Sequence, residues 1–249
     1  MKHNLITFAI SLSSLLAGGA QAVFLPVQED AVYQDGLRVG AISLNDQPVI
    51  VDIGNLGDDL LDSGADYFSA ASFTTNSASI GANILDLSIN HELYAFTSNN
   101  SATANFDFKT LVSVDGNLGD GGKLGIYAVA PVNFGVSMRI NPHAGQALGD
   151  PVKIDASAVY DMFDDGNGNP DIERSGDASM YFFLNNSLVG SFAGASAETS
   201  FIARIGDTLQ LYGSSQSVIS AASATFAAGE NPSAMQASSM KAAFTVTPV

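Results

Sequence analysis

The stretch that decides the fold is Ala-Asn-Phe-Asp-Phe-Lys-Thr-Leu-Val-Ser-Val, residues 104–114. Its side chains alternate in character, so that one face of an extended chain carries Phe106, Phe108, Thr110 and Val112. The opposite face is mostly polar and carries Asn105, Asp107, Lys109 and Leu111. A period of two is expected of an antiparallel strand with one buried and one exposed face. We therefore predict a strand here whose phenylalanines point into a core.

The rest of the chain is divided in the same way by turn-forming residues. Clusters of Gly, Asn, Asp or Pro recur about every ten residues, and the runs between them are rich in Val, Ile, Phe, Tyr and Thr. The clearest further runs are 37–44, 48–53, 93–97, 124–140, 152–160, 179–184, 199–205, 208–212 and 242–249. The Ala-rich segments 217–228 and 234–243 flank a Gly-Glu-Asn-Pro turn and are predicted to form a strand hairpin rather than two short helices. The sequence thus predicts an all-β protein, a single antiparallel two-sheet β-sandwich of jelly-roll-like type over residues 23–249.

Residues 1–22 have the order of features of a secretory signal peptide. Lys2 and His3 precede the apolar run Leu5–Leu16, and Ala20-Gln21-Ala22 matches the small-residue pattern at a cleavage site. We expect residues 1–22 to form a signal-peptide helix that is removed after Ala22, and the mature protein to be secreted or held at the cell surface. The apolar run is shorter than the roughly 20 residues that span a membrane, so no stable membrane span is expected after cleavage.

Charge and composition exclude several classes of function. The chain has 25 acidic and 9 basic residues, a net charge of −16. Loss of Lys2 with the signal peptide leaves 8 basic residues, so the charge of the mature chain becomes −17. Such a surface repels phosphate, and nucleic acid is not expected as a partner. There is no cysteine, which excludes thiolate metal sites and cysteine nucleophiles.

One motif suggests an enzyme. Leu60-Leu61-Asp62-Ser63-Gly64-Ala65 resembles the catalytic motif of retroviral-type aspartic proteases, and the preceding segment 48–54 is similar to the strand that leads into it. That resemblance implies a dimer in which Asp62 from each chain shares a proton and activates water. The Gly-rich flap and the later apolar pair with Gly are missing, since the segment Ser79–Ala82 comes too soon. A non-catalytic protein is therefore the leading expectation, and a protease using Asp62 is an alternative.

Acidic residues gather in three predicted loops, at 58–66, 115–120 and 164–173. The third has oxygen-bearing side chains at every second position, namely Asp165, Asn167, Asn169, Asp171 and Glu173. Calcium takes six to eight oxygen ligands, and a curled loop can bring such side chains together. Pro170 and Gly176 stand where an EF-hand would have its Gly and its last acid. These five residues are thus a candidate for a looser calcium site, and calcium is the one cofactor that we consider.

The two ends of the predicted mature chain resemble a known family. Val23–Asp30 is similar to the openings of flocculation-associated members of the exosortase-processed (PEP-CTERM) exported bacterial proteins, and Ala242–Val249 resembles the stretch before their sorting tail. The resemblance implies a secreted, largely β, non-enzymatic protein of the biofilm matrix. We therefore predict a non-catalytic extracellular matrix or surface protein that self-associates or contacts extracellular polysaccharide. A carbohydrate-binding module with surface tyrosines is a further alternative.

Overall fold

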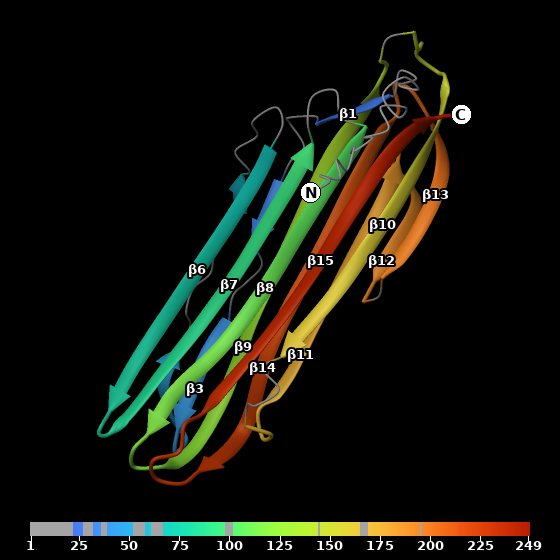
Figure 1. The fold of residues 1–249 in the computed structure, drawn as a ribbon. Coiled ribbons are helices and arrows are strands. Elements are labelled where there is room, and N and C mark those ends of the chain that lie inside the picture. The colour runs from blue at the N-terminus through green and yellow to red at the C-terminus, as the bar shows by residue number, and fades with distance from the viewer. Residues whose placement is uncertain are drawn as a thin grey trace, which may run out of the picture.

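The structure is a computed structural model that describes residues 22–26, 32–35, 39–51, 58–60, 67–97, 102–143, 145–164, 169–194 and 196–249. Within these ranges, two antiparallel sheets of nine and six strands lie face to face in an elongated sandwich (Figure 1). The predicted all-β sandwich is confirmed. In the described part of the chain, no helix has the length and apolar character needed to cross a membrane.

The nine-stranded sheet is built on β9 (Gly122–Asn141) and β14 (Thr208–Phe226), which pair along most of their length. Three short strands pair with successive parts of the other edge of β9, namely β1 (Val23–Pro26), β2 (Val32–Asp35) and β3 (Val39–Leu44). Outside them lie β4 (Gln47–Val51), paired with β3, and β5 (Asp58–Leu60), paired with β2. Beyond β14 lie β11 (Glu173–Leu184) and then β12 (Ser187–Ala193).

The six-stranded sheet has the order β13-β10-β15-β8-β7-β6. Its strands are β13 (Ala197–Arg204), β10 (Pro151–Asp164), β15 (Ser233–Pro248), β8 (Thr103–Leu118), β7 (Asn83–Thr97) and β6 (Tyr67–Ile80). In Figure 1, β6 lies along one side of the sandwich and β13 lies near the other. The predicted strand 104–114 is the centre of β8, and the side chains predicted to point inward are buried there, including Phe106, Phe108, Thr110 and Val112.

The predicted hairpin of segments 217–228 and 234–243 is wrong, although both segments are strands. The first belongs to β14 in the nine-stranded sheet, and the second belongs to β15 in the six-stranded sheet. The turn between them crosses from one sheet to the other, because each strand finds its backbone partners elsewhere: β14 on β9 and β11, and β15 on β8 and β10. Small buried residues such as Ala221 and Ala234 then face the interior from opposite sides.

Two hairpins are closed by two-residue turns with positive φ at both positions. Asn45 and Asp46 join β3 to β4, and Asn185 and Asn186 join β11 to β12, all four with positive φ between 49° and 67°. Two successive residues in this region form a turn whose twist matches that of paired strands, and Asn and Asp tolerate it best after Gly. These turns set the register of β3 on β4 and of β11 on β12.

The interior is divided into two apolar clusters by a polar belt. The first cluster holds aromatic rings in edge-to-face contact, with ring centres 5.9 Å apart for Phe106 and Phe244 and 5.0 Å apart for Phe182 and Phe244. The second cluster is aliphatic, with members that include Leu87, Ile89, Val112, Ile126 and Ile219. Between the clusters lie buried polar side chains from β8, β14 and β15, which we call the hydroxyl belt: Thr110, Ser215, Ser217, Gln236 and Ser238.

Candidate functional site

Some residues singled out from the sequence lie outside the described part of the chain. Asp62, the alternative catalytic residue, is one of them, and so are Asp165 and Asn167 of the calcium loop. The protease and calcium hypotheses therefore stay predictions. The described members of the calcium loop are Asn169, Asp171 and Glu173.

The side chain of Asn169 stabilises a turn through a hydrogen bond to the backbone. Its Oδ1 accepts a hydrogen bond from the Asp171 backbone N–H at 2.8 Å. Its carbonyl oxygen accepts bonds from Ile172 N–H at 3.1 Å and from an Nη2 of Arg174 at 3.4 Å. Asp171 and Glu173 are exposed, and both reach a groove on the nine-stranded sheet. Over the described ranges, no group of three or more His, Asp or Glu side chains is placed to hold a metal ion.

The other two predicted acidic loops are partly strand. Asp58 and Asp59 lie in β5, where Asp59 pairs with a residue of β2. Asp115 lies within β8 directly opposite Asp86 of β7. Asp120 is in a turn, and its Oδ2 accepts the Ala82 backbone N–H at 3.2 Å. Where the structure describes them, these acidic residues therefore lie in paired strands or in a turn.

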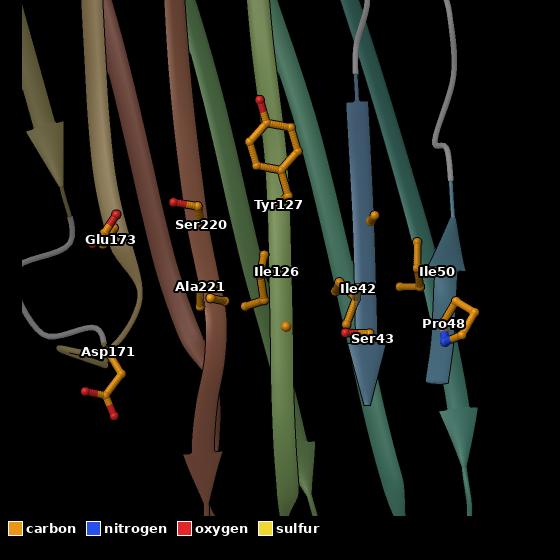
Figure 2. Close-up of a pocket in the computed structure, with 13 residues that line it drawn as sticks. Ile42, Ser43, Pro48, Ile50, Ile126, Tyr127, Asp171, Glu173, Ser220 and Ala221 are labelled. Carbon is orange, nitrogen blue, oxygen red and sulfur yellow. The ribbon is translucent and has the colours of Figure 1, made fainter. Parts of the chain in front are cut away.

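A groove of about 560 Å³ that includes Asp171 and Glu173 lies on the outer face of the nine-stranded sheet. It crosses the sheet from β11 over β14 and β9 to β3 and β4 (Figure 2). One cross-strand row on this face reads Glu173, Ser220, Tyr127, Ala41. The next row along the strands is formed by small residues, with Gly125 opposite Ser43 of β3 and Ala222 nearby on β14. A single large side chain, Tyr127, therefore stands beside a floor of small ones.

Strand irregularities accompany the floor on both sides. The register between β14 and β9 shifts between Ala221 and Ala224, and the register between β3 and β4 shifts between Ile42 and Ser43. Such bulges bend a strand locally and are frequent beside binding sites. At Gly125, an added Cβ would lie 2.5 Å from the Ser43 Oγ, so the Ser43 hydroxyl fills the space that a side chain at position 125 would need. The groove is thus built from residues that lie far apart in the sequence.

The ends of the groove differ in chemistry. Figure 2 shows Asp171 and Glu173 at one end, Pro48 and Ile50 at the other, and the ring of Tyr127 over the middle strand. Tyr127 is 52% exposed although it lies in the centre of a sheet. Among the described residues that line the groove, none is basic. It therefore offers one aromatic face, two carboxylates and two serine hydroxyls to a ligand.

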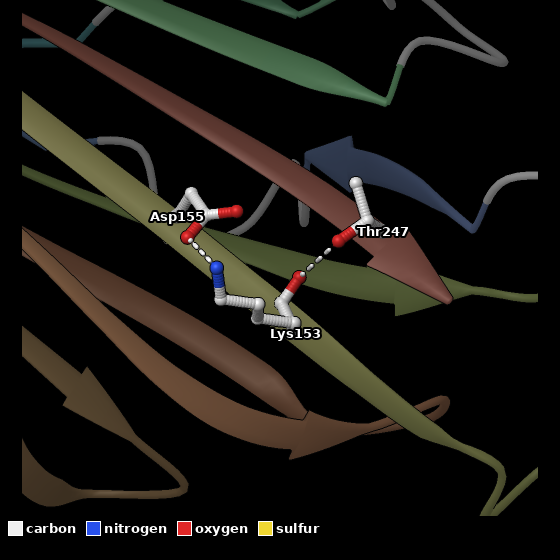
Figure 3. Close-up of polar contacts among 3 residues, drawn as sticks. All are labelled: Lys153, Asp155 and Thr247. Atoms are coloured by element: carbon white, nitrogen blue, oxygen red, sulfur yellow. Dashed lines mark hydrogen bonds and ion pairs between the residues drawn. The ribbon is translucent and has the colours of Figure 1, made fainter. Parts of the chain in front are cut away.

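A second hollow, of about 600 Å³, lies on the outer face of the six-stranded sheet over β10, β13 and β15. Its lining includes Asp155 and Glu198 but no aromatic ring. The carboxylate of Asp155 is engaged by the Lys153 ammonium at 2.6 Å, and the Lys153 carbonyl accepts a bond from Thr247 (Figure 3). Both charged side chains are about half exposed, so the pair adds little stability. This hollow is the weaker candidate because it has no aromatic ring and the Asp155 carboxylate already has a partner.

A third feature is the free edge of β6. This strand pairs with β7 over all 14 residues, and among the described strands none pairs with its other side. The last strand, β15, does not offer such an edge: Phe244 and Thr245 lie between β10 and β8, and Val246–Pro248 pair with β10. Neither β6 nor Tyr127 was among the residues singled out from the sequence. An uncharged run at 67–80 and a glycine within a predicted strand at 125 were the signals that could have found them.

Comparison with known proteins gives no match: no protein-family model, curated protein or solved structure is significantly similar to this chain.

Proposed function

We propose that this protein is an exported, non-catalytic structural component of an extracellular matrix or cell surface, and that its copies join edge to edge through β6. The observation that carries the proposal is the uncharged edge of a 14-residue strand, with which no other described strand pairs. The signal-like residues 1–22 and the resemblance of the chain ends to flocculation-associated proteins support export to a matrix.

The edge of β6 lacks the features that keep sheet edges apart. Natural edge strands are usually short, or carry Lys, Pro or bulges that prevent pairing with another chain. β6 has 14 residues, Tyr-Phe-Ser-Ala-Ala-Ser-Phe-Thr-Thr-Asn-Ser-Ala-Ser-Ile, with no charge and no Pro, and its pairing with β7 has no register shift. The opposite edge of the same sheet, β13, has 8 residues and carries Glu198 and Arg204. The two edges are therefore protected very differently.

Antiparallel pairing of β6 with β6 of a second copy joins neutral residues throughout. With Tyr67 opposite Ile80 of the other copy, Phe73 faces Thr74, and no like charges meet anywhere along the strand. Such a pair forms on the order of a dozen backbone hydrogen bonds and continues one sheet through both molecules. Because the chain carries a charge of −16, other contacts between copies meet more repulsion than this edge does.

The test measures association of the mature chain from Val23 by light scattering and electron microscopy, over a range of concentration and at low and high salt. We expect association that increases with concentration, and that increases with salt because salt screens the repulsion. Ser77→Lys places a charge at an exposed position of the edge and should give monomers. The matched control is Asn105→Lys, at an exposed position of the central strand β8, which should associate like the wild type.

Both substitutions reduce the negative charge equally, so a difference between them reports on the edge and not on net charge. A monomer at every concentration and salt, or equal association of both variants, would refute the proposal. Circular dichroism and melting of each variant establish that the fold is retained.

A further inference from the structure

From the geometry of the groove across β11, β14, β9 and β3, we propose that this groove binds a neutral, hydroxyl-rich polysaccharide chain. This site is separate from the β6 edge, since the two lie on different sheets. The inference therefore does not depend on self-association.

The ring of Tyr127 supplies an apolar platform. It is about half exposed in the middle of a sheet, and the lining residues Gly125 and Ala222 have little or no side chain. The axial C–H groups of a sugar ring form a flat apolar face of similar size, and an aromatic ring with a polar tip suits a ligand that is partly apolar and partly wet. A chain lying on the floor of the groove can pack a sugar face against this ring.

Polar groups of the lining match sugar hydroxyls. The carboxylates of Asp171 and Glu173 accept hydrogen bonds, and hydrogen bonds with a charged partner are stronger than those between neutral groups. The hydroxyls of Ser43 and Ser220 both donate and accept. The groove crosses four strand spacings, or roughly 19 Å, which suits an extended chain better than a compact molecule.

Charge distinguishes neutral polysaccharides from charged ones. The groove has two carboxylates and no basic side chain in its lining, on a chain of net charge −16, so it disfavours anionic polymers. A cationic peptide would be held best by carboxylates on both sides of the ring. Here they lie at one end only, while the other end has Pro48 and Ile50 (Figure 2). A neutral chain fits this arrangement best.

The test is affinity electrophoresis of the mature protein in gels that contain hydroxyethyl cellulose, galactomannan or dextran as neutral polymers, and alginate as an anionic one. We expect at least one neutral polymer to retard the wild type, and alginate not to retard it. Tyr127→Ala should weaken that retention about tenfold or more, the usual effect of removing a central aromatic contact. Ala222→Gln, which fills the exposed floor of the groove, should weaken it as well.

The matched control is Tyr181→Ala. Tyr181 is 43% exposed on the same outer face, in β11, and does not line the groove. This variant should keep the wild-type retention. Failure of every neutral polymer to retard the protein, equal loss in both tyrosine variants, or equal retardation by alginate would each overturn the proposal. Ser77→Lys, the variant that blocks association through β6, should still bind the polymer, which separates failure of this site from failure of self-association.

Discussion

The hydroxyl belt leads to a quantitative prediction about Thr110 and Ser217. Both side chains are fully buried, and their hydroxyl oxygens are 2.8 Å apart. The Ser217 hydroxyl donates to the Thr110 backbone carbonyl at 3.0 Å, so in their mutual bond the Thr110 hydroxyl is the donor. The next acceptor for Thr110 is the Ser215 Oγ, at 3.4 Å. The two hydroxyls thus form one local network between β8 and β14.

The stability losses from removing the two hydroxyls should not be additive. Thr110→Val keeps the shape and removes one buried hydrogen bond, which should lower the free energy of unfolding by about 1 kcal/mol. Ser217→Ala leaves the buried Thr110 hydroxyl without its close acceptor, which should cost about 1–3 kcal/mol. In the double variant neither group is left behind. We therefore expect its loss to be smaller than the sum of the single losses by about 1 kcal/mol.

The assay is urea unfolding of the mature chain and its three variants, followed by circular dichroism under identical conditions. For a domain of this size, each kcal/mol should also move the melting temperature by about 2–4 °C. The reasoning would be refuted if the losses added within about 0.5 kcal/mol, since that would show that the two hydroxyls are not coupled. Equal m-values across the four proteins are required for the comparison.

Three further predictions concern the core, the acidic surface and the calcium loop. Phe244→Ala should destabilise the fold by about 3–5 kcal/mol, measured by urea unfolding, because it removes a fully buried ring that contacts two others. Burial raises the pKa of Asp107 above its ordinary 3.8, against the smaller lowering effect of Lys241. The Asp107 carboxyl therefore keeps its proton to higher pH in the folded state than in the unfolded state. The contribution of Asp107 to the free energy of unfolding thus falls as the pH rises above 3.8. Asp107→Asn should remove that decline, so the free energy of unfolding of the variant, relative to that of the wild type, should increase with pH. A difference between the two proteins that stays constant with pH would contradict this. If the 165–173 loop binds calcium, saturating calcium should raise the melting temperature relative to EGTA; indifference to EGTA would argue against the site.

The two proposals suit a molecule at a surface or in a matrix. Pairing at β6 extends the six-stranded sheet sideways, and this leaves the groove on the outer face of the nine-stranded sheet accessible. An assembly of this kind would present one groove per copy. Polymer binding and self-association then act together, since the two grooves of a β6-paired dimer hold a long chain more firmly than one groove does.

The candidate sites were only partly predictable. Asp171 and Glu173 were singled out as oxygen ligands, and the structure places both at one end of the groove. Their neighbour Tyr127 is more than 40 residues earlier in the chain, and only the pairing of β11 with β14 and of β14 with β9 brings it into the same row. Sequence spacing does not reveal such pairings, because any extended segment can offer its backbone to any other.

The sequence by itself determined the class of the fold and the direction of its strongest side chains. The alternation at 104–114 was enough to bury Phe106 and Phe108, because successive side chains of a strand point to opposite faces. Only the tertiary structure decided which strands became neighbours, that β6 has a free edge, and that Thr110 meets Ser217 in a buried belt. Those outcomes depend on backbone hydrogen bonds and sheet packing between segments that can lie more than a hundred residues apart, and these interactions leave no local pattern in the sequence.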